Sequence, residues 1–301
     1  MKLHNDSTVR FKIKLNLLPL MQLPWRIPAR HSCRKFQMES LIFGKIIIFL
    51  FTIPNMKIIT WNCNMAFRKK AGIILEHKPD ILIIPECEHP DKLKFNDGTT
   101  KPTDLLWFGS NQNKGLGIFS YSDFRFKQLD IYNPAIKMVV PIAVSGGKFD
   151  FTLFAIWANN PGDPDGCYVE QVWKAIHQYE HHLSNKRTVL IGDFNSNAIW
   201  DRKRRISNHS NVVKVLKEKG IVSSYHLHHK QIQGKENHPT LYMYRHRDKP
   251  YHLDYCFTSM DMAKKIHSVE IGDYDDWIKY SDHVPVAVTF NLSRFSKKKL
   301  Q

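Results

Sequence analysis

The stretch Thr188–Asn195, which reads TVLIGDFN, is an apolar run that ends in a glycine and then presents polar side chains. Val189–Ile191 has the composition of a buried strand, and Gly192 allows the backbone to approach a neighbour or a ligand closely. Asp193 and Asn195 would leave the end of this strand from a rigid base. Because a strand that ends in Gly-Asp is also a common turn, the stretch predicts metal-dependent chemistry only if other strand ends supply partners.

Further predicted strands carry polar side chains of the same kind at their ends. These are Asn62 and Asn64 after KIITW, Glu86 after ILIIP, Asp254 within HLDYCF, and Asp282 with His283 before VPVAVTF. Carboxylate and amide oxygens are ligands that Mg²⁺ prefers, and a histidine beside an aspartate makes a general acid or base. Zinc would need cysteine or more histidine, which these positions do not offer. Each motif alone fits a solvated turn, but the set predicts one hard-metal site.

The remaining pattern predicts more strands than helices. Besides TVLIGDFN, strands are expected at 57–62, 81–85, 105–108, 115–121, 124–129, 136–144, 149–157, 240–244, 252–257, 263–271 and 284–290, and helices at 66–77, 168–183 and 212–219. Meanders mixed with strand–helix–strand units indicate two packed sheets covered by helices, rather than one doubly wound sheet. We therefore expect one α/β domain over 56–293.

The segments outside this domain are basic and lack a sustained hydrophobic period. We expect 1–55 to be an extension that is poorly ordered or that precedes the true start at Met56, and 294–301 to be a basic tail. The five cysteines include no CxxC pair, which indicates free thiols in a reducing compartment. We expect a cytoplasmic protein, although secretion or organelle targeting by 1–55 stays open.

The formal net charge is +16 and the sequence pI is near 9.6. This balance favours anionic partners, namely nucleic acid, an anionic membrane surface or phosphorylated substrates, while a role in solubility alone is the alternative. No apolar run reaches the roughly 18–20 residues that span a bilayer.

The motifs WNCN, IIPECE, GDFN, HLDYCF and SDHVP, in this order, resemble the motif series of the endonuclease/exonuclease/phosphatase superfamily, which includes deoxyribonuclease I and the exonuclease III-type apurinic endonucleases. The resemblance covers essentially the whole chain after the N-terminal extension. It implies a four-layer α/β sandwich of two packed mixed sheets flanked by helices, as in deoxyribonuclease I. It also implies hydrolysis of a phosphate ester at the sheet edges.

The resemblance implies a metal ion, Mg²⁺, which Mn²⁺ can replace. Asn62, Glu86 and Asp282 would lie around this ion, with Asn64 near it. The ion would neutralise charge on the pentacovalent phosphorus centre while a water attacks in line.

The same resemblance assigns four residues to the reaction itself. Asp193 would position or deprotonate the attacking water, or hold a second metal, and Asn195 would bind the scissile phosphate. His283 would form a dyad with Asp254. The histidine would act either as a general base or as a protonated clamp on the phosphate.

One position departs from the pattern of the family's nucleases. They place a tyrosine or histidine that contacts the phosphate at the end of the strand before the long helix. Here Trp157 occupies that position, and Asn159 follows shortly after. Because an indole donates one hydrogen bond and cannot transfer a proton, the step that this residue carries is left open.

Further substrate contacts are predicted from basic residues near the motifs. The candidates are Arg68 and Lys69 after WNCN, Arg202 after GDFN, and His238 and Arg245 before HLDYCF. Such side chains contact phosphates without reading sequence. A solvated basic face, or a structural loop histidine in the case of His238, is the alternative.

The combined reading predicts a monomeric Mg²⁺-dependent phosphodiesterase that acts on DNA, as an endonuclease rather than an exonuclease. A phosphatase or phospholipid diesterase with a small or lipid phosphate ester as substrate is the first alternative. A non-catalytic binding protein on the same scaffold is the second.

Overall fold

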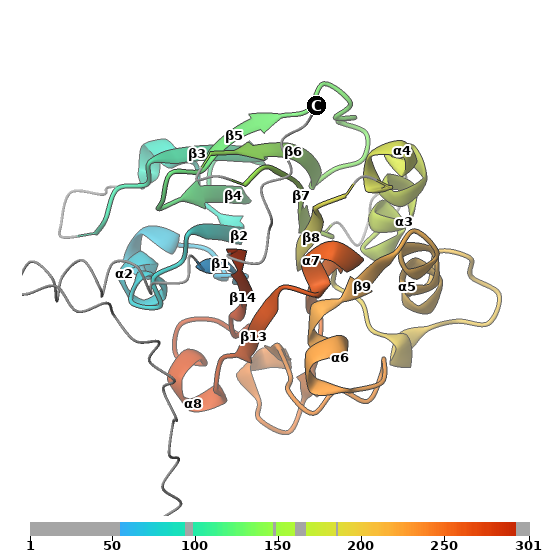
Figure 1. The fold of residues 1–301 in the computed structure, drawn as a ribbon. Coiled ribbons are helices and arrows are strands. Elements are labelled where there is room, and N and C mark those ends of the chain that lie inside the picture. The colour runs from blue at the N-terminus through green and yellow to red at the C-terminus, as the bar shows by residue number, and fades with distance from the viewer. Residues whose placement is uncertain (1–54, 94–98, 147–148, 160–166, 185, 293–301) are drawn as a thin grey trace, which may run out of the picture. The chain divides into compact units, whose positions relative to one another are not determined.

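Two six-stranded sheets contain most of the strands in the computed structural model, which describes residues 55–93, 99–146, 149–159, 167–184 and 186–292 (Figure 1). The first sheet has the order β13-β14-β1-β2-β4-β3, with bounds Ile266–Ile271, Val286–Asn291, Asn55–Thr60, Ile81–Cys87, Lys114–Ser120 and Asp104–Asn111. Here β1 and β2 are parallel and the other neighbours are antiparallel. The expectations for 1–54 and for the basic tail lie outside the described residues.

The second sheet has the order β5-β6-β7-β8-β12-β9, with bounds Arg125–Gln128, Val139–Ser145, Phe151–Trp157, Thr188–Asp193, Asp254–Ser259 and Ile221–Ser223. Only β7 and β8 are parallel in this sheet, so both sheets are mixed. A separate two-stranded sheet pairs β10 (Leu241–Tyr242) with β11 (Pro250–Tyr251).

The main core lies between the two large sheets, because their central strands are apolar on both faces. In β2, Ile81 and Ile83 point into the space between the sheets, while Leu82 and Ile84 pack on the opposite face. In β8, Val189 and Ile191 face the first sheet and Leu190 faces outward. The period of two along a strand therefore divides each apolar run between two cores.

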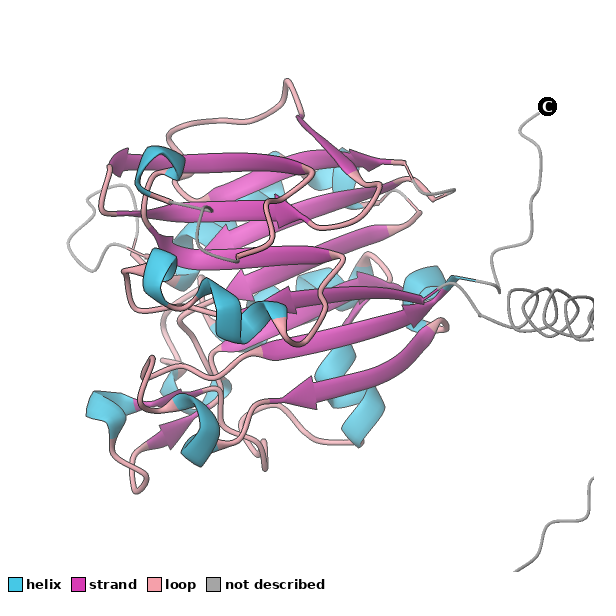
Figure 2. Ribbon diagram, turned by 90° about the vertical axis from the view of Figure 1, so that its left-hand side faces the viewer, coloured by secondary structure: helices cyan, strands magenta, loops and turns pink. Residues whose placement is uncertain are grey.

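Helices cover the outer faces of both sheets (Figures 1 and 2). Over the first sheet, α2 (Ala71–Leu75) and α8 (Tyr274–Trp277) contribute Ile74 and Trp277. Over the second, α3 (Val169–Gln178), α4 (Glu180–Leu183) and α5 (His209–Glu218) pack against Leu190 and its neighbours. The predicted four-layer sandwich is confirmed.

Several predicted elements are shorter or divided in the structure. The helix expected at 66–77 is a 3₁₀ turn at Phe67–Lys69 followed by α2, because Ala66 is left-handed and Lys70 leaves the helical region. The helix expected at 168–183 breaks at Tyr179 into α3 and α4. These helices depend on packing rather than on a long run of periodic residues.

Other elements were placed wrongly or missed by the sequence prediction. The start of the strand expected at 263–271 belongs to α7 (Met260–Ala263), and β13 begins at Ile266. The sequence also gave no indication of α6 (Ser224–His229), which packs against β12 and β13. None of the helices within the described ranges is long and apolar enough to cross a membrane.

Candidate active site at the sheet edges

The end of β8 approaches its neighbour β7 too closely for any side chain. Gly192 has φ +146°, and a Cβ atom there would lie 1.8 Å from the Ile156 carbonyl oxygen. Any larger residue at position 192 would therefore clash with β7. Because glycine has no side chain, β8 pairs with β7 up to Asp193, the last residue of β8. The pairing places Asp193 opposite Trp157, and the Asp193 carbonyl accepts a hydrogen bond from the Ala158 N–H at 2.8 Å.

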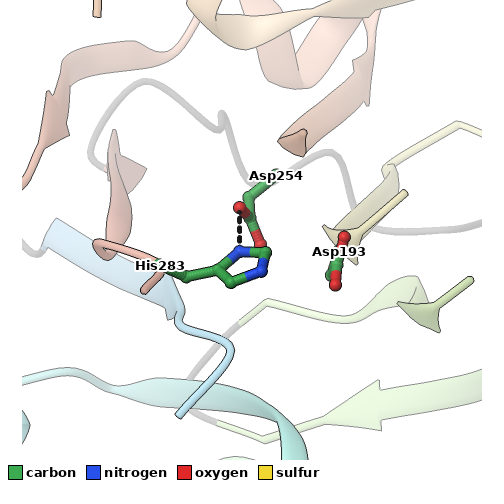
Figure 3. A group of neighbouring side chains, drawn as sticks. All are labelled: Asp193, Asp254 and His283. Atoms are coloured by element: carbon green, nitrogen blue, oxygen red, sulfur yellow. Dashed lines mark hydrogen bonds and ion pairs between the residues drawn. The ribbon is translucent and has the colours of Figure 1, made fainter. Parts of the chain in front are cut away.

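Three of the predicted catalytic side chains lie together at this edge (Figure 3). Asp254, the first residue of β12, pairs with Asp193 of β8 in an antiparallel ladder of the second sheet. His283 precedes β14 in the other large sheet, and its Nδ1 lies 2.8 Å from Asp254 Oδ2. One polar atom from each of the three side chains falls within 4.8 Å of the others, and the second ring nitrogen of His283 faces Asp193 (Figure 3).

Burial makes the charges of this group strongly interdependent, because charged groups are costly to desolvate. It lowers the pKa of His283, but the charge of Asp254 and the hydrogen bond to it raise that pKa to about 10 overall. Burial and the charge of Asp254 raise the pKa of Asp193 to about 7, against the opposing effect of His283. These shifts favour an imidazolium at His283 and make Asp193 easier to protonate than an ordinary aspartate.

Two neighbouring side chains form hydrogen bonds with the backbone of the segments that carry the dyad. Thr240 Oγ1 accepts from the backbone N–H groups of both Leu253 and Asp254, at 2.9 and 3.0 Å. The indole N–H of Trp61 donates to the His283 carbonyl at 3.0 Å. The two residues predicted to be catalytic are thus held by Thr240, which precedes β10, and by Trp61, which follows β1.

Glu86 leaves the end of β2 through an irregular backbone. The register between β2 and β4 shifts between Pro85 and Cys87, and Glu86 itself has φ +64°. A left-handed conformation at a non-glycine residue within a bulge is a feature that clusters at functional sites, where it aims one side chain. The bulge directs Glu86 toward Asn62, whose Nδ2 lies 3.4 Å from Glu86 Oε1 and 3.1 Å from Asp193 Oδ2.

Asn64 connects the end of β1 with the segment that carries His283. It begins a run of three left-handed residues, Asn64, Met65 and Ala66, which turns the chain sharply after the strand. Asn64 Nδ2 donates to Asp282 Oδ1 at 2.8 Å, and Ser281 Oγ donates to the Asn62 carbonyl at 2.7 Å. The turn therefore brings the predicted metal ligands of the first and the last motif together.

Asn195 lies beside the Asp193 carboxylate. Its backbone N–H donates to Asp193 Oδ1 at 2.8 Å, and its φ is +47°. Its side chain is partly exposed, whereas that of Asp193 is completely buried. The amide can therefore meet a ligand that approaches the edge, with Asp193 beneath it.

The donor set around Asn62 fits a hard divalent cation. Glu86 and Asp282 offer carboxylate oxygens, the ligand type that Mg²⁺ and Mn²⁺ prefer. Asn62 presents its Nδ2 to Glu86 and Asp193, while its Oδ1 accepts from the Asn64 N–H at 3.0 Å, so its amide would have to rotate to ligate a cation through oxygen. Asp254 Oδ1, on the adjoining side, is buried and accepts no hydrogen bond within the described part of the chain. A buried carboxylate oxygen without a donor is costly in an apo site, and a nearby cation or a donor from the substrate lowers this cost.

The predicted substrate contacts divide into two groups. Trp157 is 2% exposed, and with Asn159 it lines a hollow beside the site. Two of the basic candidates, Arg68 and Arg245, have partners within the protein. Arg68 pairs with Glu88 at 2.5 Å, and Arg245 donates to the carbonyls of Ile278 and Lys279.

The remaining candidates lie on loops. Lys69 is exposed at the end of its 3₁₀ turn, and Arg202 is exposed after the turn Ala198–Trp200. His238 Nδ1 lies 2.9 Å from the Tyr225 hydroxyl, and the His238 carbonyl accepts from His252. Their contact with substrate stays a prediction.

Three residues at the site were not assigned a role from the sequence. Lys114 Nζ lies 3.2 Å from Glu86 Oε1, Ser281 anchors Asn62, and Thr240 holds the start of β12. Ser281 is part of the SDH motif, which was the available signal. Lys114 and Thr240 stand in ordinary strand and loop sequence, and only the pairing of distant segments brings them to the site.

The comparison with known proteins agrees with this geometry. The model of the endonuclease/exonuclease/phosphatase family matches residues 59–283. The chain belongs to this family. It is therefore a metal-dependent phosphoric ester hydrolase, as the ordered motifs predicted. A comparison of the sequence with curated proteins gives no match.

Solved structures of family members share the fold. The endonuclease domain of TRAS1, a telomere-specific non-LTR retrotransposon, is 17% identical, with a TM-score of 0.55 over 80% of this chain and 100% of that one. The 3′ phosphatase NExo from Neisseria, bound to a product DNA hairpin, is 20% identical, with a TM-score of 0.53 over 78% and 99%. An AP endonuclease from Archaeoglobus fulgidus is 19% identical, with a TM-score of 0.53 over 79% and 100%.

Proposed function

We propose that this member of the family is a Mg²⁺-dependent phosphodiesterase that cleaves DNA internally. The observation that carries the proposal is the joint position of Asp193, Asp254 and His283 beside Asn62 and Glu86. A buried acid, an acid–histidine dyad and oxygen ligands are the groups that phosphate ester hydrolysis needs at one point.

The metal would be held by Asn62, Glu86 and Asp282, with Asn64 orienting Asp282 through its side-chain amide. When bound there, Mg²⁺ supplies Lewis-acid polarisation of a phosphoryl oxygen and charge neutralisation. Mn²⁺ satisfies the same ligands, because both ions accept oxygen donors.

The protein groups divide the remaining work. Asp193, with a pKa raised to about 7, is suited to orient the attacking water and take its proton near neutral pH. Asn195 donates an amide N–H to a phosphate oxygen, from a backbone position fixed by Asp193. His283, kept protonated by Asp254, donates from Nε2 to the phosphate and stabilises the negative charge that develops there.

DNA as the substrate is supported by charge and by the similar structures. The net charge of +16 favours a polyanion, because basic side chains bind phosphates of any sequence. Exposed Lys69 and Arg202 follow two of the active-site strands and are available for such contacts. One similar structure, NExo, contains a product DNA hairpin.

Plasmid nicking tests this proposal. We expect supercoiled plasmid to be converted to the open circular form with Mg²⁺, and no conversion with EDTA. Asp193→Asn should abolish nicking. Asp275→Asn, which removes an exposed carboxylate on α8, is the matched control and should retain it. Activity on a small or lipid phosphate ester without any nicking would reject DNA as the substrate.

A further inference from the structure

A hollow of about 640 Å³ opens beside Glu86, on the side of the site away from β14, the strand that follows His283. This volume falls within the ~300–1,000 Å³ typical of small-ligand sites. The wall combines aromatic rings with polar and cationic groups, among them Trp107, Phe108, Lys114, Tyr132, Trp157 and Asn159.

Lys114, at the start of β4, lines the hollow and contacts Glu86, one of the predicted metal ligands. Its ammonium lies 3.2 Å from Glu86 Oε1 and 5.3 Å from the centre of the Trp157 ring. Its side chain remains 36% exposed, so substrate can reach it. An ammonium carries three donors, and a single carboxylate oxygen does not use them all.

Trp157 provides the apolar floor on which this cation lies. Its register with Asp193 places it at the same sheet edge as the buried acid. The indole carries no positive charge, but a cation over its face is favourable. Lys114 therefore places beside Trp157 a charged donor that a phosphate can contact.

The other rings are fixed in orientation. The Trp107 indole N–H donates to the Cys87 carbonyl at 3.1 Å, and Phe108 packs edge-on against Tyr132 with ring centres 5.6 Å apart. Phe108 and Tyr132 pack on the same side of the sheet as Trp157, whereas Trp107, the neighbour of Phe108 in β3, points to the other side. The rings of Phe108 and Tyr132 can therefore stack with a nucleobase in the hollow while Lys114 contacts its phosphate. Base stacking on aromatic side chains is tolerant of sequence.

We propose that the hollow binds an unstacked nucleobase next to the scissile phosphate, and that Lys114 is the residue that positions this phosphate. The inference rests on the proposed function and narrows it. The nucleotide beside the cut must leave the stack, so single strands and transiently opened segments of a duplex are cleaved in preference to closed duplex.

The test uses thymidine 5′-monophosphate as a probe, titrated calorimetrically into the full chain in EDTA, where metal ligation cannot contribute. Lys114→Met keeps the aliphatic stem and removes the charge. Lys264→Met is the matched control, because Lys264 is exposed just after α7, roughly 17 Å of strand beyond Asp254.

We expect Lys114→Met to weaken binding of the probe about tenfold or more, since hydrogen bonds to charged groups contribute about 1.5–3 kcal/mol. Lys114→Arg should restore most of the affinity, and Lys264→Met should bind as the wild type does. With Mg²⁺ and a single-stranded oligonucleotide, Lys114→Met should raise KM more than it lowers kcat.

Two results would overturn the inference in distinguishable ways. A wild-type chain that cleaves DNA, with Lys114→Met and Lys264→Met binding the probe equally, removes the subsite and leaves the proposed function. A wild-type chain that cleaves neither plasmid nor oligonucleotide removes the proposed function, and the inference that rests on it, whatever the binding result.

Discussion

The protein contains two buried histidine–carboxylate pairs with nearly the same distance between their polar atoms. His283 and Asp254 are 2.8 Å apart at the active site, and His226 and Glu236 are 3.0 Å apart near α6. The side chains of both pairs are at most 10% exposed. Distance and burial alone therefore do not separate the pair that we predict to be catalytic from the other pair.

The pair at α6 has its polar atoms engaged within the protein. His226 Nδ1 contacts Ser223 and Gln233, while Glu236 accepts from the Gly234 N–H and from Asn197. Burial raises the pKa of Glu236, but the hydrogen bonds that it accepts lower it to about 2. This closed network fixes the segment that follows GDFN.

The pair at the active site is left open instead. Asp254 Oδ1 accepts no hydrogen bond from any described residue, and the second nitrogen of His283 faces Asp193 rather than a neutral partner (Figure 3). Unsatisfied capacity in a buried site is costly for folding, and natural proteins keep it where a ligand or a reaction uses it. The free acceptor on Asp254 can therefore meet a ligand, whereas both carboxylate oxygens of Glu236 are engaged within the protein.

The largest expected difference between the pairs is in catalysis. His283→Gln should lower kcat for DNA cleavage by about 10²–10³-fold, the range for loss of one donor that stabilises charge in the transition state. His226→Gln should leave kcat per folded molecule within a few-fold of wild type. Steady-state cleavage assays on both variants check this, and equal losses would remove the distinction between the pairs.

The stability effect should run in the opposite direction. Glu236→Ala breaks the closed network, because it removes the carboxylate partner of His226, the acceptor of the Gly234 N–H and one of the acceptors of Asn197 Nδ2. The free energy of unfolding should fall by about 3–5 kcal/mol, as for the loss of one partner of a buried pair. Asp254→Asn should cost less. Urea unfolding compares the two, and a larger loss for Asp254→Asn would contradict the prediction.

Asp254→Asn should also change the titration of His283. Without the carboxylate, burial dominates, and the pKa of His283 should drop from about 10 by more than one unit, each unit being about 1.4 kcal/mol. NMR of the imidazole protons measures this. An unchanged pKa would show that Asp254 does not hold the proton on the ring.

The smallest expected effect is a pH dependence of stability. Because the folded-state pKa of Glu236 is depressed to about 2 from an ordinary 4.5, its stabilising contribution is present above pH 4.5 and is lost as the pH falls toward 2. Glu236→Gln should therefore show a shallower loss of stability between these values. Urea unfolding midpoints of the wild type and Glu236→Gln at pH 6 and pH 3 provide the comparison. Equal losses of stability in the two proteins would contradict the prediction.

Much of the site was predictable because its residues come at the ends of strands with strong local signals. TVLIG and ILIIP are continuous apolar runs, and the residues that follow such runs necessarily lie at a sheet edge. The ordered motifs then indicated which edges belong together. The structure brings Asp193, Asp254 and His283 within one group, as that order implied.

The helical segments were less predictable for a physical reason. Short helices such as α2 and α6 have too few residues for a clear period, and packing against the sheets stabilises them. The break at Tyr179 likewise follows from its buried position against Phe154, which no local pattern of the sequence expresses.

By itself, the sequence determined most of the long strands, the two packed sheets covered by helices and the polar residues at the strand ends, since these follow from local periodicity and composition. Only the tertiary structure decided which polar groups are left open. Asp254 and Glu236 are both acids beside a histidine, and Lys114 is one of many lysines. Their different roles depend on the register of β8 with β12 and on the bulge at Glu86, which set the distances between residues far apart in the chain.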